Sequence, residues 1–63
     1  MKKIYDKQGE FKGILTSIDE IKDDWQFRTF EPFVRAGCVI YEYEPGKYGA
    51  IPGTSCEIVE AEK

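Results

Sequence analysis

A run of β-branched and aromatic side chains on either side of a proline-glycine pair constrains the fold most. Residues 38–44 read Cys-Val-Ile-Tyr-Glu-Tyr-Glu, a composition typical of a strand. Residues 44–47 fit a type II turn, because Pro45 presets φ and Gly46 supplies the positive φ that must follow. Residues 47–51 return as the second arm. We therefore predict an aromatic β-hairpin here, which points to binding more than to catalysis.

Three other segments are predicted strands. Residues 4–6 and 11–15 flank a polar loop in which Gly9 can take a positive φ and Asp6 can bond the turn backbone, so they predict a second hairpin. Residues 25–30 alternate apolar and polar side chains, which predicts a strand that Pro32 terminates. Residues 56–61 predict a last strand.

A capping signature predicts one helix. Residues 17–20, Ser-Ile-Asp-Glu, match the capping box, in which the serine oxygen and the glutamate side chain each satisfy a free backbone N–H. Apolar side chains recur at spacings of three and four, as on one helical face: Leu15, Ile18, Ile21 and Trp25. We predict a short amphipathic helix over residues 18–24. It would end at Asp23 and Asp24, although carboxylates at a helix C-terminus are slightly unfavourable.

These elements predict one domain, residues 1–63, of the α+β class. Its core is a small curved antiparallel sheet of five to six short strands, which can close toward a barrel, with the short amphipathic helix packed on it. A 63-residue chain buries only about 60% of the surface that its unfolded form exposes. Such a core typically supplies about 3–5 kcal/mol, so a disulfide, a metal or a partner subunit is often needed.

The composition favours a partner over the other two supports. Zinc sites want four Cys or His ligands, whereas the chain has Cys38, Cys56 and no histidine, so we expect no metal and no cofactor. The N-terminal residues lack the apolar stretch of a secretory signal, which predicts a reducing cytoplasmic location and two free, buried thiols. The remaining source of support for the small core is a partner, either a second copy, for example in a homodimer, or another protein.

Charge and hydropathy restrict the partners. Twelve acidic and nine basic side chains give a net charge of −3, a surface that a nucleic-acid backbone repels. No run approaches the roughly 18 apolar residues of a membrane span. We therefore expect a soluble protein that binds neither nucleic acid directly nor a membrane.

Catalytic groups do not stand out. Without histidine, a carboxylate or lysine would have to act as general base, and no paired arrangement separates from the acidic background. Ser55 lacks the Gly-x-Ser-x-Gly elbow, and no helix follows the glycines of residues 46–53 to hold a phosphate. We predict that the protein is not an enzyme.

The tyrosines are the candidate binding residues. Alternation along residues 38–44 places Val39, Tyr41 and Tyr43 on one side of the strand. They can pack on the helix, since aromatic side chains dominate small cores. Alternatively, they form an exposed contact patch with side chains typical of interface hot spots. The predicted binding residues are Tyr41, Tyr43, Tyr48, Arg35 and Trp25.

Part of the chain is similar in spacing to short chitin-binding modules, which present aromatic side chains to sugar rings. The similar residues are Ala36-Gly37, Val39, Tyr41 and Lys47-Tyr48-Gly49-Ala50. Cys38, however, stands where those modules commonly have an aspartate, and no secretion signal accompanies it. The chain is therefore not assigned to that family.

Three functions remain. The first is a protein-interaction module, such as the small acidic inhibitors that phages and mobile elements encode, which bind and block a host protein. The second is a ligand-binding module in which Trp25 and the hairpin tyrosines stack on a sugar or a nucleotide base. The third is a structural subunit of a homo-oligomeric assembly. We favour the first, because the chain is short, acidic and rich in aromatic residues.

Overall fold

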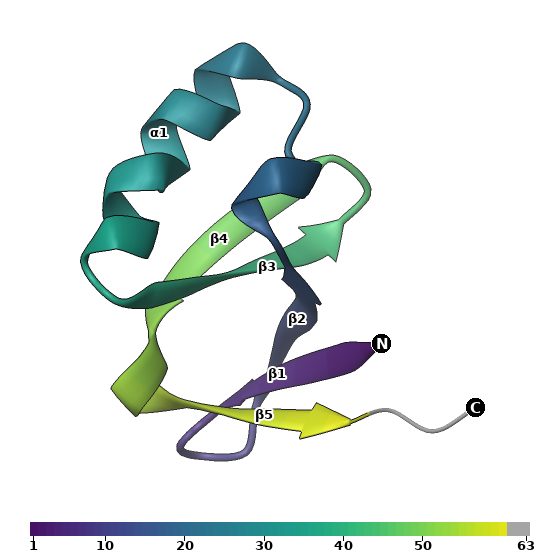
Figure 1. Cartoon of the computed structure of the whole chain (residues 1–63). Coiled ribbons are helices and arrows are strands. Elements are labelled where there is room, and N and C mark those ends of the chain that lie inside the picture. The colour runs from purple at the N-terminus through teal and green to yellow at the C-terminus, as the bar shows by residue number, and fades with distance from the viewer. Residues whose placement is uncertain (61–63) are drawn as a thin grey trace.

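Five antiparallel strands form one sheet in the order β4-β3-β2-β1-β5. The computed structural model describes residues 1–60 (Figure 1). Its strands are β1 (Lys2–Asp6), β2 (Phe11–Thr16), β3 (Cys38–Glu44), β4 (Lys47–Pro52) and β5 (Cys56–Glu60). One α-helix, α1 (Asp24–Arg35), and two 3-10 helices, η1 (Ile18–Glu20) and η2 (Gly53–Ser55), complete it. The α+β prediction is confirmed, and over these residues the edge strands β4 and β5 do not pair to close a barrel.

Turn chemistry explains both predicted hairpins, which are confirmed. Gly46 has φ of 79° in the β3–β4 turn, and its N–H donates to the Glu42 carboxylate at 2.9 Å. Gly9 has φ of 88° in the β1–β2 loop, where one Asp6 carboxylate oxygen accepts from two backbone N–H groups, at 2.8 and 2.9 Å. The last predicted strand is confirmed as β5, and residue 61 lies outside the described residues.

The helix lies later in the chain than the sequence predicted. Only the single turn η1 follows Ser17, whose oxygen accepts from the Asp19 N–H at 3.2 Å, so the predicted helix 18–24 is wrong. Asp23 is instead the N-cap of α1, and its carboxylate accepts from the Gln26 N–H at 3.0 Å. A carboxylate at this end is favourable, because the N-terminus of a helix is its positive pole.

The predicted strand over residues 25–30 is also wrong, because these residues belong to α1. The apolar side chains of residues 25–30 fit both the side-chain period of a strand and that of a helix. Trp25 and Phe27 are two apart, as on one face of a strand, whereas Phe27 and Phe30 are three apart, as on one face of a helix. The cap at Asp23 favours the helix, which continues through Pro32.

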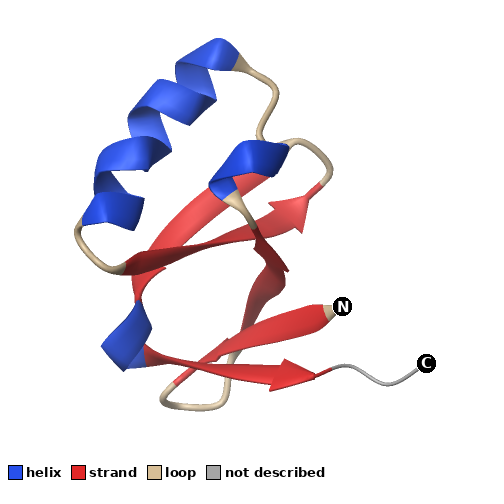
Figure 2. Ribbon diagram, viewed as in Figure 1, coloured by secondary structure: helices blue, strands red, loops and turns tan. Residues whose placement is uncertain are grey.

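The helix covers one face of the β3–β4 part of the sheet (Figure 2). The ring of Phe30 packs against that of Tyr48 at a centroid distance of 6.4 Å. Alternation along β4 places Tyr48 on the same face as Ala50, and Ala50 pairs with Ile40. Ile40 is buried, and so is its β2 neighbour Thr16. We call this the helix-covered face.

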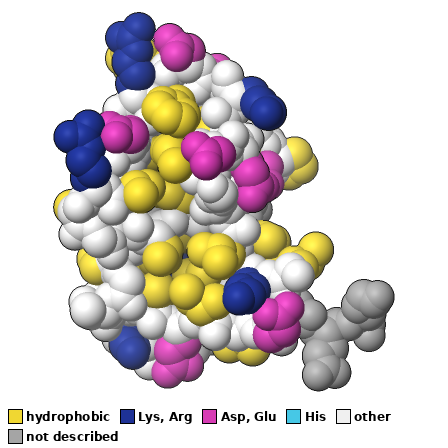
Figure 3. Space-filling model, viewed as in Figure 1, with side chains coloured by type: hydrophobic (Ala, Val, Ile, Leu, Met, Phe, Trp, Pro, Cys, Tyr) yellow, Lys and Arg dark blue, Asp and Glu magenta, His cyan; other side chains and the backbone are white. Residues whose placement is uncertain are grey.

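The opposite face, here called the inner face, holds a second apolar layer. Ile4 pairs with Gly13, and alternation along β2 places Gly13 and Leu15 on the same side. Leu15 pairs with Tyr41, so this face continues across β3. Ile4 is fully buried although α1 lies on the other side, because the sheet bends along β2 and folds this face onto itself (Figure 1). Apolar side chains gather between β3 and the β1–β5 pair (Figure 3).

Gly13 allows this close approach of β2 and β3. A methyl group there would lie 2.7 Å from the Glu42 carbonyl oxygen and 2.9 Å from the Tyr41 ring. Gly13→Ala should therefore lower the free energy of unfolding in urea by about 1–3 kcal/mol, since the backbone of β3 must move. Gly53→Ala is the control, because within 4 Å its methyl would meet only the Gly37 carbonyl oxygen, at 3.2 Å, which a small shift relieves. Equal losses in the two variants would contradict this explanation.

Candidate functional site

The two β3 tyrosines lie on the inner face, as the alternation predicted, but not against α1. The Tyr41 ring lies over Gly49 and Gly13, where added methyl groups would approach it within 2.9 Å. Its centroid is 6.2 Å from that of Tyr43. Tyr41 is half-buried, and Tyr43 is 53% exposed. The expectation that this side packs on the helix is therefore wrong, because α1 covers the other face.

Tyr48 and Arg35 do not join the two β3 tyrosines. Tyr48 is on the helix-covered face, half-buried against Phe30. Arg35 lies in the last turn of α1, where it donates two hydrogen bonds to the Glu31 carboxylate at 3.0 and 2.6 Å. These bonds, with the attraction between the charges, hold the pKa of Glu31 below its usual value and raise that of Arg35. The predicted patch of Tyr41, Tyr43, Tyr48 and Arg35 is thus not one surface.

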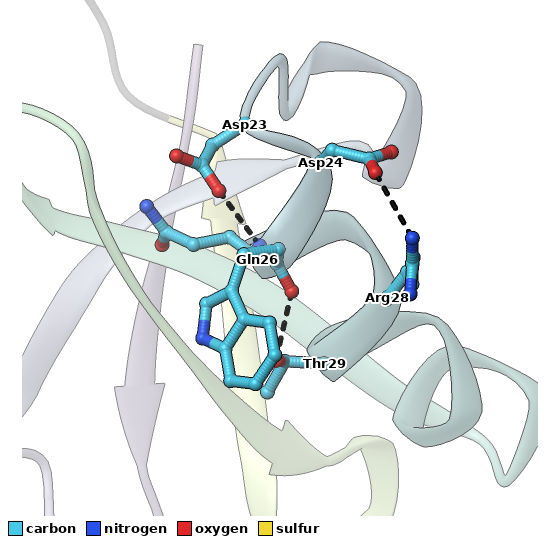
Figure 4. Close-up of polar contacts among 6 residues, drawn as sticks. Asp23, Asp24, Gln26, Arg28 and Thr29 are labelled. Carbon is cyan, nitrogen blue, oxygen red and sulfur yellow. Dashed lines mark hydrogen bonds and ion pairs between the residues drawn. The ribbon is translucent and has the colours of Figure 1, made fainter.

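Trp25 is the most exposed of the predicted binding residues. It lies in the first turn of α1, 76% exposed, and its carbonyl accepts a hydrogen bond from the Thr29 hydroxyl at 2.9 Å (Figure 4). At 100° per residue, Trp25 projects nearly opposite to Phe30, which packs on the sheet. An exposed tryptophan that points away from the core adds nothing to the packing of its own domain.

Other exposed side chains continue from Trp25 along the same side of the helix. They follow at spacings of four, three, one and three residues, so they share one side of α1. We call this side the outer face: Trp25, Thr29, Pro32, Phe33 and the capping residue Ala36. Phe33 is 47% exposed, although its ring also lies 6.3 Å from that of Phe30. This face was not predicted, because residues 25–30 were expected to form a strand.

Charges of alternating sign border the outer face on one edge. Asp24 and Arg28 lie 3.4 Å apart, and Glu31 and Arg35 2.6 Å apart, each pair one helical turn apart. Figure 4 shows the first pair, and Figure 3 shows acidic and basic side chains side by side along α1, at the upper left. Three of the four side chains are at least three-quarters exposed. Their charges are therefore available to a docking partner.

The second exposed apolar region lies at the other end of the sheet. Phe11, Ile58 and Val59 are about half exposed there, with Ile58 and Val59 on opposite faces of β5. The edge strand β5 also carries Glu60, which pairs with the N-terminal ammonium at 3.6 Å and with Lys2 at 3.8 Å. Because β1 and β2 lie between β5 and the strands that α1 covers, Ile58 and Val59 cannot share a compact contact surface with the outer face. Phe11 begins β2, at the end away from the residues that pair with β3.

Residues 1–60 enclose no pocket and hold no group of three or more side chains suited to a metal ion. Over the same residues, no helix is long and apolar enough to cross a membrane. Both thiols are free; Cys56 is buried as predicted, whereas Cys38 is only half-buried.

Comparisons with known proteins add no further constraint on the site. No protein-family model matches the chain, and neither the curated proteins nor the solved structures include a match.

Proposed function

We propose that this protein is a non-enzymatic protein-interaction module that contacts its partner through the outer face of α1. The observation that supports this proposal is the position of Trp25, 76% exposed in the first turn and directed away from the sheet. Tryptophan and arginine are enriched among the residues that carry most of the binding energy of interfaces. Trp25 lies on the outer face, and Arg28 lies about one turn further along, on its charged border.

The spacing of the outer face supports the same proposal. Trp25, Thr29, Pro32 and Phe33 stand at positions i, i+4, i+7 and i+8. Helices that dock into apolar grooves or against other helices use anchors at such spacings. The sheet already holds α1 through its opposite side, so a partner can cover the outer face without unfolding the domain. Inhibition of a host protein, as the sequence suggested, is one use of such a contact.

The alternative contact surface is centred on Tyr43. It is also exposed, but its neighbour Tyr41 is held against Gly13 and Gly49, and Tyr48 lies on the other side of the sheet. That region therefore presents one free aromatic side chain. The outer face presents two, Trp25 and Phe33, together with a border of charges.

Trp25→Ala should abolish capture of the partner, and Tyr43→Ala should not. Tagged wild-type and variant proteins would be incubated with lysate of cells that also express the untagged chain, and the captured proteins identified by mass spectrometry. Titration of the purified partner should then show a loss of affinity of about 30-fold or more for Trp25→Ala, which corresponds to a hot spot of about 2 kcal/mol. Circular dichroism should show that both variants remain folded.

If the β3 tyrosines form the contact, the two substitutions should have the opposite effects on capture of the partner. Loss of the partner in Tyr43→Ala, with normal capture by Trp25→Ala, would contradict the proposal and favour the hairpin. The proposal would also be contradicted if the wild-type protein captured no partner that is lost in Trp25→Ala.

A further inference from the structure

The charges that border the outer face indicate what covers it. In chain order they are negative, positive, negative and positive: Asp24, Arg28, Glu31 and Arg35. The midpoint between Arg28 and Glu31 is also the midpoint between Asp24 and Arg35, and both pairs have opposite signs. This pattern is self-complementary under a two-fold rotation that reverses the helix.

The rotation brings the same edges of two helices together. When two copies of α1 face each other antiparallel, a two-fold axis perpendicular to both helices keeps the charged edge of each copy on the same side. Asp24 of one copy then lies opposite Arg35 of the second, and Arg28 lies opposite Glu31. In a parallel arrangement the two-fold axis runs along the helices and puts the two charged edges on opposite sides of the interface, where they cannot pair with each other.

The same alignment also pairs the apolar parts of the outer face. The first turn of one helix lies against the last turn of the other, so Trp25 of each copy comes to the turn that holds Phe33 of the second. Pro32 and Thr29 occupy the middle, close to the axis. The two most exposed apolar side chains of α1 would thus be covered together.

We propose that a second copy of this chain covers the outer face, and that the two copies form an antiparallel dimer through α1. This inference rests on the proposed function, because it takes the same face as the contact surface and names its partner. The small core adds a reason: among residues 1–60, four apolar side chains are buried, Ile4, Ile21, Ile40 and Cys56. Domains of this size commonly need a partner subunit for stability.

Charge reversal tests the pairing directly. An acidic variant, Arg28→Glu with Arg35→Glu, and a basic variant, Asp24→Lys with Glu31→Lys, each carry four like charges along the edge. Light scattering should give twice the 7.3 kDa chain mass for wild type and the single mass for each variant alone. An equimolar mixture of the two variants should form a heterodimer, which native mass spectrometry identifies from the different chain masses.

Two further measurements make the test decisive. Circular dichroism establishes that each variant is folded, and Trp25→Ser offers a single change at an exposed position, which should weaken the wild-type dimer by about tenfold or more. A wild-type protein that is monomeric at the highest concentration it tolerates would overturn the dimer. So would a dimer that both charge variants still form alone, since its contact would lie elsewhere.

The failure of this inference can be told apart from that of the proposed function. If wild type is monomeric but captures a different protein in a Trp25-dependent manner, the outer face is an interaction surface whose partner is not a second copy. If it is monomeric and captures nothing that depends on Trp25, both proposals are wrong.

Discussion

Ile4→Ala will remove most of the free energy of unfolding of this domain. Ile4 is 0% exposed in β1, between β2 and β5, and it belongs to the layer that forms where the sheet folds onto itself. Truncation of a buried isoleucine to alanine costs about 2–5 kcal/mol, through lost burial and the cavity that remains. A core of this size supplies about 3–5 kcal/mol in total, so the variant should be largely unfolded or close to it.

Ile58 provides the matched control for this prediction. It pairs directly with Ile4 on the neighbouring strand, but it is 48% exposed. Ile58→Ala should therefore cost much less, on the order of 1 kcal/mol. Urea unfolding should be followed by circular dichroism, because Trp25 lies on the outer face and its fluorescence would report loss of a second copy more than unfolding of the core. Equal losses at both positions would show that the inner face is not a closed layer at Ile4.

Pro32→Ala will make the protein more stable. Pro32 is the ninth of the twelve residues of α1, where it has no N–H to donate to the Arg28 carbonyl and its ring crowds that group. Alanine is about 3 kcal/mol more favourable than proline in the interior of a helix. Pro32 is exposed on the outer face of the single chain, so the change removes little packing within one copy. We expect a gain of about 1–3 kcal/mol, and thermal unfolding about 4–8 °C higher for each kcal/mol.

Pro52→Ala is the control for this gain. Pro52 ends β4 outside any helix, so its replacement should relieve no helical strain. It should instead lower stability slightly, by about 0.4–1 kcal/mol, because the unfolded chain becomes more flexible. If Pro32→Ala were neutral or destabilising, the proline ring would be contributing contacts within the wild-type protein. Those contacts could lie at the dimer interface, which a repeat of the measurement at several concentrations would reveal.

The two hairpins could be predicted because each depends on residues close together in the sequence. The β3–β4 turn needs a positive φ at Gly46, and the β1–β2 loop uses Gly9 with the Asp6 carboxylate. The helix could not be placed as well, because residues 25–30 satisfy the strand period and the helical period together. The predicted helix did leave one sign of error, since it ended on carboxylates, which are unfavourable there. In the structure, Asp23 caps the N-terminus of α1.

The candidate site, like the fold, could be predicted only where it depends on local sequence patterns. Alternation along β3 correctly placed Tyr41 and Tyr43 together, because the side-chain period of a strand is a local property. Which face of the sheet the helix covers depends on how the chain returns after α1, and no local pattern encodes that. For this reason Tyr48 and the two β3 tyrosines ended on opposite faces. Trp25 is exposed for the same reason, because the side of α1 that packs on the sheet leaves Trp25 on the opposite side.

Local sequence patterns were enough to predict the α+β class, the two hairpins, the final strand and the side-chain alternation of β3. Turn and strand preferences act over a few residues, so they can be read without coordinates. Only the tertiary structure decided that α1 begins at Asp24, that it covers the side of Ile40 and Tyr48, and that Trp25 faces outward. Those outcomes depend on which apolar surfaces the whole chain can bury at once, because burial between distant segments is the dominant favourable term in folding.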